Sequence, residues 1–165
     1  CMYSYVNPLM LQEGGFAPEA LSLIMVGAGF GMVVGNITSG KLSDHYRPGM
    51  VACVTQGCAS LALLAIFFVA HCGWLSALLV MVCTTCLFAV SSPQQFLILK
   101  FAPGGEMLGG ASIQMAFNIG NAIGAFCGGL PMEYGLGYNY PALVGVPFAI
   151  VGCIFLLWFS RRYEG

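Results

Sequence analysis

The stretch SGKLSDHYRPG, residues 39–49, places two basic residues, an acid and a histidine between two long apolar runs. Charge is scarce elsewhere: 7 % of the 165 residues are charged, 59 % are hydrophobic, and the mean hydropathy is +0.88. One soluble core of this length could not bury so much apolar side chain, so the chain is predicted to lie in a lipid bilayer. The charged stretch then predicts a short loop at the membrane surface.

Apolar runs continue on both sides of this loop. About 20 residues cross the ~30 Å hydrocarbon layer of a bilayer, and charged and turn residues mark where each span stops. Five complete spans are predicted within residues 13–165, at about 20–40, 50–70, 74–99, 108–132 and 140–160. Residues 1–12 are apolar over about half of that length, so they are predicted to be the end of a sixth span. The chain begins at Cys1 without a signal sequence, and we therefore expect a fragment of a longer protein.

The basic residues predict the orientation in the membrane. Lys41 and Arg47 follow the first complete span, Lys100 follows the third, and Arg161 and Arg162 follow the fifth, so all five fall on one side. Lys and Arg favour the cytoplasmic side, which predicts a multi-pass membrane protein with a cytoplasmic carboxyl terminus. The net charge of −1 provides no basic patch, so no nucleic-acid partner is expected. On this evidence alone, the loop would only fix the topology.

The spacing within the loop is more specific. Gly40, Leu42 and Asp44 form the pattern G-x-L-x-D at the end of one predicted helix, and Arg47 and Pro48 begin the next. This pattern resembles the cytoplasmic-loop signature of the major facilitator superfamily of transporters, G-x-L-x-D-[RK]-x-G-[RK], which joins the second and third helices of a six-helix unit.

The match to this signature is partial. His45 stands where a basic residue is usual, Arg47 where glycine is usual, and Pro48 in the last basic position. The resemblance implies a gating loop formed by Gly40, Asp44 and Arg47, in which Asp44 matches the signature directly. In the family, a pair of opposite charges in this loop is thought to hold it closed. This sequence keeps the residues of that charge pair only in part.

The resemblance covers essentially the whole chain. It is carried by four further stretches: ALSLIMVGAGFGMVVGNITSGKLSD (20–44), LFAVSSPQQFLIL (87–99), GGEMLGGASIQMAFNIGNAIGAFCGG (104–129) and GLGYNYPALVG (135–145). Together they resemble the carboxyl-terminal half of the arabinose efflux permease group, in the drug:proton antiporter branch. This implies an all-α integral membrane fold, the carboxyl-terminal six-helix half of a twelve-helix bundle, with the end of the seventh helix followed by the eighth to the twelfth.

The expected function follows from this resemblance. It implies a secondary active transporter that exports sugars or drug-like small molecules by alternating access, coupled to protons. The implied location is the bacterial inner membrane. The implied partners are the lipid bilayer, the missing amino-terminal half, the solute and protons, and no cofactor is expected. A second class of protein is also consistent with the sequence: a non-transporting membrane scaffold or assembly subunit whose glycine rows only bind partner helices.

Two rows of glycine recur at every fourth position within predicted spans. They are Gly27, Gly31 and Gly35 in the first complete span, and Gly120, Gly124 and Gly128 in the fourth. Small residues let membrane helices approach closely, so both rows are predicted to be helix-packing surfaces. Such a surface could be static, or it could be a smooth face along which helices slide when the two halves of a carrier rock.

Side-chain amides are the candidate solute ligands. Gln114, Asn118 and Asn121 lie at i, i+4 and i+7 and therefore share one face of the fourth span, beside its glycine row. They could hydrogen-bond a polar solute, or they could satisfy one another and backbone carbonyls across helices. Weaker candidates of the same kind are Tyr3, Tyr5, Asn7, Asn36, Gln94 and Gln95.

The spans lack the residues that other functions need. No Asp, Glu, Lys, Arg or His falls in the middle of a span, so a proton carrier is expected in the missing half. The spans contain no Ser/His, Asp/Asp or His/Glu set, so neither an enzyme nor a metal site is expected. Cys83 and Cys86 form a single C-x-x-C in mid-span without a second pair. Cys53, Cys58, Cys127 and Cys153 are predicted to behave as small apolar residues.

Overall fold

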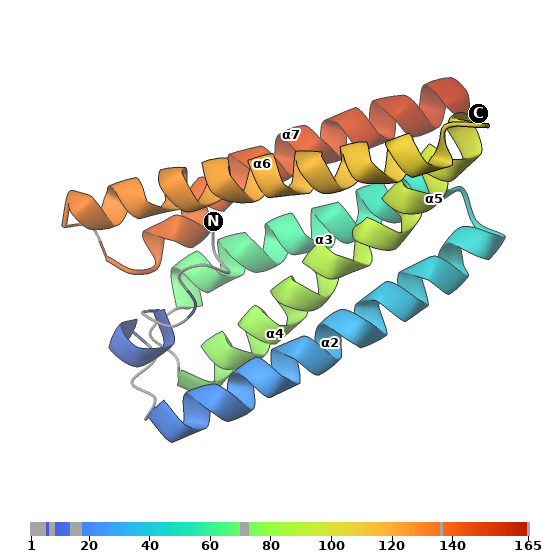
Figure 1. Cartoon of the computed structure of the whole chain (residues 1–165). Coiled ribbons are helices and arrows are strands. Elements are labelled where there is room, and N and C mark those ends of the chain that lie inside the picture. The colour runs from blue at the N-terminus through green and yellow to red at the C-terminus, as the bar shows by residue number, and fades with distance from the viewer. Residues whose placement is uncertain (1–5, 7–8, 14–17, 70–72, 136, 165) are drawn as a thin grey trace.

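The computed structural model describes residues 6, 9–13, 18–69, 73–135 and 137–164, and this part of the chain is helical without strands. The predicted all-α class is confirmed. The elements run side by side as a bundle of long helices (Figure 1). In chain order they are the π-helical turn η2 (Leu9–Glu13) and the helices α2 (Pro18–His45), α3 (Pro48–Val69), α4 (Gly73–Ala89), α5 (Ser91–Phe101), α6 (Glu106–Glu133) and α7 (Tyr140–Tyr163).

Four helical segments of the described residues are long and apolar enough to cross a membrane. They are Ala20–His45, Pro48–Val69, Gly73–Phe101 and Tyr140–Tyr163. Helix α6, which contains the remaining predicted span, has 28 residues and is also long enough, but its amides and glycines make it less apolar.

The segment between Gly73 and Phe101 is divided at Val90 into α4 and α5. Pro93 has no backbone N–H, so it cannot donate to the carbonyl of Ala89 four residues earlier. The next N–H, that of Gln94, reaches the Val90 carbonyl at a long 3.4 Å. The helix therefore breaks where its proline is expected to weaken it.

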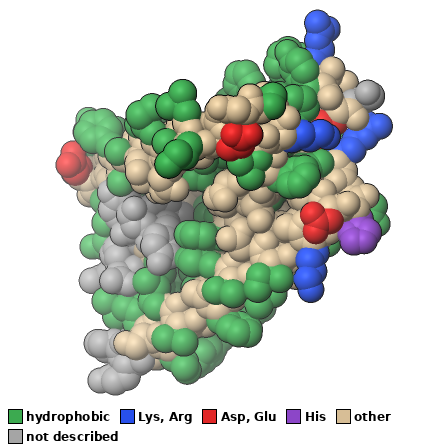
Figure 2. Space-filling model, turned by 45° about the vertical axis from the view of Figure 1, so that its right-hand side comes forward, with side chains coloured by type: hydrophobic (Ala, Val, Ile, Leu, Met, Phe, Trp, Pro, Cys, Tyr) green, Lys and Arg blue, Asp and Glu red, His purple; other side chains and the backbone are tan. Residues whose placement is uncertain are grey.

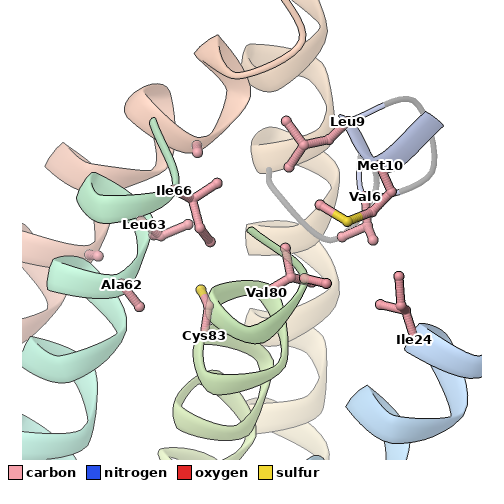
Figure 3. Close-up of a cluster of buried hydrophobic side chains, with 12 residues drawn as sticks. Val6, Leu9, Met10, Ile24, Ala62, Leu63, Ile66, Val80 and Cys83 are labelled. Atoms are coloured by element: carbon pink, nitrogen blue, oxygen red, sulfur yellow. The ribbon is translucent and has the colours of Figure 1, made fainter. Parts of the chain in front are cut away.

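Helix α3 lies at the centre of the bundle, between α4 and α7, while α2 packs on the far side of α4 (Figure 1). The buried Ile66 of α3 and Val80 of α4 belong to one apolar cluster. Figure 3 shows Leu9 and Met10, from the turn η2, reaching into the same cluster. The turn η2 is thus anchored on the central helices.

The start of α3 is held by the end of α7. Gly49, in the first turn of α3, donates its backbone N–H to Oε2 of Glu164 at 2.9 Å. The first N–H groups of a helix have no partner within it, and a carboxylate there also complements the helix dipole. A Cβ built on Gly49 would lie 2.5 Å from the same oxygen, so only glycine permits this approach.

Removing this cap should destabilise the bundle. We expect Glu164→Ala to lower the free energy of unfolding by about 1 kcal/mol, the usual cost of losing a capping side chain. The measurement is thermal unfolding of the purified full-length parent in detergent. Glu133→Ala, at the exposed end of α6, is the control and should leave the midpoint unchanged. Equal midpoints for the two variants would show that the Glu164 cap contributes nothing.

Candidate functional site: two amide-bearing pockets beside α6

The glycine row of α2 lies against α4. A methyl group added at Gly27 would overlap the side chain of Met81, and one added at Gly31 would overlap that of Thr85. At Gly35 the nearest atom would be the backbone oxygen of Thr85, at 2.5 Å. The row therefore forms a tight seam, in which the backbones of α2 and α4 approach as closely as small residues allow.

The glycine row of α6 is divided between two environments. Gly124 and Gly128 are buried. Gly120 is exposed, and a methyl group built there would meet no atom within 4 Å. Within the described part of the chain, Gly120 therefore does not serve the helix packing that the sequence predicted, because no other helix lies close against it. It borders a pocket instead.

This pocket has a volume of about 340 Å³ and lies between α3, α4, α6 and α7. Its lining residues are Gln56, Leu63, Leu87, Gly120, Asn121, Ile123, Gly124, Gly145, Phe148 and Ala149. Three of these residues are glycines, whose missing side chains help to leave the space open. The lining carries two polar side chains, Gln56 and Asn121, in otherwise apolar surroundings.

Gln56 was not among the predicted site residues. It lies on α3, where its Nε2 donates a long hydrogen bond of 3.4 Å to the carbonyl oxygen of Ala149 on the neighbouring helix α7. The signal that could have found it is the one that pointed to Asn121: an amide within an apolar span needs a polar partner.

A second pocket, of about 200 Å³, lies between α5 and α6. Its lining residues are Gln95, Ile98, Leu99, Gly110, Ile113 and Gln114. Gln114 and Asn121 are seven residues apart, which is about 10 Å along the helix axis. Asn118 lies between them on the same face and is exposed. Asn118 lines neither pocket, but the other two amides of the predicted face each line one, together with an amide from another helix.

One of the weaker candidates, Gln95, lines the second pocket. Asn36 is exposed on α2 and Gln94 is half-buried on α5, and neither lines the two pockets. Tyr3, Tyr5 and Asn7 lie outside the described residues.

The predicted gating loop is shorter than its sequence suggested. Helix α2 continues to His45, so Gly40 and Asp44 lie in its last turns, and Tyr46 and Arg47 alone separate it from α3. The last turn is extended by a contact of 3.1 Å between the His45 ring nitrogen and the Lys41 carbonyl oxygen. Asp44 and Arg47 are both exposed.

If Asp44 gates transport, removing its charge should slow transport without affecting insertion. We expect Asp44→Asn in the full-length parent to reduce the transport rate about two- to fivefold, because an exposed charge interaction contributes up to about 1 kcal/mol. The rate is measured in vesicles at matched protein content. Glu133→Gln removes an exposed acid from the other end of the bundle and should have no effect. An unchanged rate for Asp44→Asn would remove the gating role.

One carboxyl group near the site has a perturbed pKa. In the turn before α6, the Gly104 N–H donates to Oε1 of Glu106 at 2.9 Å, and this bond lowers the pKa of the carboxyl group. Its stabilising effect is present at neutral pH and is lost as the pH falls through the lowered value. Gly104 has φ +82°, a conformation that favours glycine. This turn joins the two helices that form the second pocket.

Comparison with known proteins agrees with this architecture. The family model described as Major Facilitator Superfamily matches residues 2–165. The chain is 43 % identical to "Putative transporter AraJ" of Escherichia coli (strain K12), over 96 % of this chain and 40 % of the relative. It is 30 % identical to "Inner membrane transport protein YdhP" of the same strain, over 98 % of this chain and 41 % of the relative.

A more distant relative is named "Probable sugar efflux transporter", from Helicobacter acinonychis (strain Sheeba), at 26 % identity over 96 % of this chain and 39 % of the relative. No solved structure matches the chain. The chain spans about two fifths of the length of these relatives, as one half of a twelve-helix carrier would. With its all-helical bundle, this chain belongs to the major facilitator superfamily of transporters and corresponds to a carboxyl-terminal half.

Proposed function

We propose that the full-length protein exports a sugar or a similar small polar solute by alternating access, and that the two pockets beside α6 contact the solute. The observation that supports this most is the larger pocket, in which Gln56 and Asn121 face an otherwise apolar lining. Its volume of about 340 Å³ is in the range of small-molecule sites. The name of the Helicobacter relative favours a sugar among the polar solutes.

The chemistry of the pocket suits such a solute. A side-chain amide donates and accepts hydrogen bonds, and sugar hydroxyl groups do the same. An amide left without a partner in an apolar environment is costly, so both pockets favour a ligand that pairs with it. The apolar side chains around the amides, such as Leu63 and Phe148, could cover the C–H faces of a sugar ring.

The proposed orientation rests on the distribution of charge. Figure 2 shows the basic side chains gathered at one end of the bundle, where α2 turns into α3 and α7 ends. By the preference of Lys and Arg for the cytoplasm, this end and the carboxyl terminus would face the cytoplasm of a bacterial inner membrane. Residues 1–12 would then be the end of the seventh helix of the parent, and residues 13–165 would hold the eighth to the twelfth.

Proton coupling is part of the same proposal. Within the described helices, no Asp, Glu, Lys, Arg or His lies in the middle of a predicted span. A charged or titrating residue at that depth is usually functional in transporters. We therefore place the proton-carrying group in the amino-terminal half. Both halves would then take part in an antiport of solute and protons.

The experiment is efflux of labelled sugars and lipophilic cations from vesicles that contain the full-length parent, with and without a pH gradient. We expect efflux of at least one sugar, and Asn121→Ala should slow it about fivefold, because a lost hydrogen bond costs about 1 kcal/mol. Ser112→Ala is the matched control, since Ser112 is a polar residue of α6 whose hydroxyl group donates to the Leu108 carbonyl at 2.8 Å.

Two outcomes would contradict the proposal. Equal efflux by Asn121→Ala and the parent would remove the larger pocket from the solute path. No efflux of any solute by the parent would favour the alternative class, a membrane scaffold that uses its glycine rows only to bind other helices.

A further inference from the structure

Cys53 of α3 and Cys153 of α7 bring their sulfur atoms within 3.2 Å of each other, although 100 residues separate them in the sequence. Each Sγ also lies near the other residue's backbone carbonyl oxygen: Cys53 Sγ is 3.6 Å from that of Cys153, and Cys153 Sγ is 3.4 Å from that of Cys53. Among the cysteines that the structure describes, this is the pair whose sulfur atoms are within hydrogen-bonding distance. The interpretation of both as small apolar residues explains their place in apolar helices but not this pairing.

Small residues flank the two thiols on both helices. A Cβ added to Gly57, one turn after Cys53, would lie 3.9 Å from Cys153 Sγ. A Cβ added to Gly152 would lie 3.5 Å from Nε2 of Gln56. Both are ordinary van der Waals distances, so α3 and α7 lie side by side at this point and the two thiols face each other in the folded bundle.

We propose that Cys53 and Cys153 form a dithiol site that a membrane-permeant peroxide oxidises to a disulfide joining α3 and α7. Cys153 is the more exposed of the two, while Cys53 is 8 % exposed. The peroxide reaches Cys153 first and converts its thiol to a sulfenic acid, which releases one water molecule. Cys53 then resolves this intermediate from its buried position.

In the second step, the Cys53 sulfur attacks the Cys153 sulfur. The S–S bond forms and the S–O bond breaks, and the hydroxyl group leaves as water with the Cys53 proton. Two thiols and one hydrogen peroxide thus give one disulfide and two water molecules. A disulfide bond is about 2.05 Å long, so the sulfur atoms must approach by about 1.2 Å from 3.2 Å, a distance that side-chain rotation can supply.

The disulfide would join the two helices that form one wall of the larger pocket. Gln56 lies one turn after Cys53, and Ala149 lies one turn before Cys153. These two residues line the pocket and are linked by the hydrogen bond from Gln56 Nε2 to the Ala149 carbonyl. The dithiol site does not depend on the proposed solute, because it is defined by the α3–α7 seam alone.

The test is peroxide treatment of membrane vesicles that contain the full-length parent. Free thiols are then blocked with N-ethylmaleimide, and the protein is digested and analysed by mass spectrometry. We expect a peptide pair that links Cys53 to Cys153 and disappears on reduction with dithiothreitol. Its abundance should exceed that of any pair containing Cys58 or Cys86 about tenfold or more, because held groups react faster than groups that must meet by motion. Cys58→Ser is the control that should keep this linkage.

A second readout follows the intermediate. Dimedone traps sulfenic acids, and in the parent Cys53 should consume the sulfenic acid of Cys153 before it is trapped. Cys53→Ser should therefore raise dimedone labelling of Cys153 several-fold, while Cys153→Ser should remove the linked peptide without raising labelling elsewhere. Absence of the linked peptide in the parent, or equal labelling of Cys153 in the parent and in Cys53→Ser, would overturn the proposal.

Discussion

Gly35→Ala is expected to destabilise the bundle more than any other single methyl addition on α2. The added Cβ would lie 2.5 Å from the backbone oxygen of Thr85 and 2.9 Å from its Cγ2. A backbone atom within a helix cannot rotate away as a flexible side chain can, so α2 and α4 must separate. Overpacking of this kind costs about 1 to 3 kcal/mol. The midpoint of thermal unfolding of the full-length parent in detergent should fall accordingly, and less protein should reach the membrane.

Gly29→Ala is the matched control for this prediction. Gly29 lies on the same helix, but a methyl group there would meet nothing within 4 Å. Alanine also favours the helix over glycine by about 0.5 to 1 kcal/mol, so this variant should be as stable as the parent or slightly more stable. Equal losses of stability in the two variants would show that α2 and α4 are not in tight contact at Gly35.

Gly120→Leu should have the opposite pattern, with transport lost and stability kept. Gly120 borders the larger pocket, and a methyl group added there would meet no atom within 4 Å, so a side chain at this position can extend into the pocket. That space is where the solute is proposed to bind, and a leucine side chain would occupy part of it next to Asn121. We expect the efflux rate to fall about tenfold or more, equivalent to at least about 1.4 kcal/mol, with an unchanged unfolding midpoint.

Ala122→Leu controls for the added leucine. Ala122 is exposed on α6 and lies about 200° around the helix axis from Gly120, away from the pocket. Its replacement should leave efflux within about twofold of the parent, as expected for a surface change of less than about 0.5 kcal/mol. Normal efflux by Gly120→Leu would exclude this pocket as the solute site.

Much of the fold could be predicted from the sequence because lipid restricts a chain to few structures. Backbone groups in hydrocarbon must be paired within a helix, so long apolar runs between charged stretches predicted an all-helical bundle. The interruption at Val90 follows from the chemistry of Pro93 alone. The end of α2 was predicted less accurately. The span was predicted to end at about residue 40, but the helix continues through the charged residues to His45.

The site was harder to predict because it depends on which helices lie opposite each other. Gly35 and Gly120 stand in rows with the same spacing, yet one is pressed against α4 and the other is open. Gln56 of α3 and Asn121 of α6 line the same pocket only because the tertiary packing places their helices around it. Likewise, nothing in the sequence around Cys53 indicates that Cys153 will be its neighbour. Such relations come from tertiary packing, which periodicity along one helix cannot report.

Alkylation of Asn121→Cys in the full-length parent can show whether a solute occupies the larger pocket. A water-soluble maleimide should label the introduced thiol, and a transported sugar should slow this labelling several-fold by covering it. Ser112→Cys, on the same helix, should be labelled at the same rate with and without the sugar. Protection of Asn121→Cys alone is the predicted result. Equal labelling of Asn121→Cys in the presence and absence of a sugar that the parent exports would contradict a solute site in this pocket.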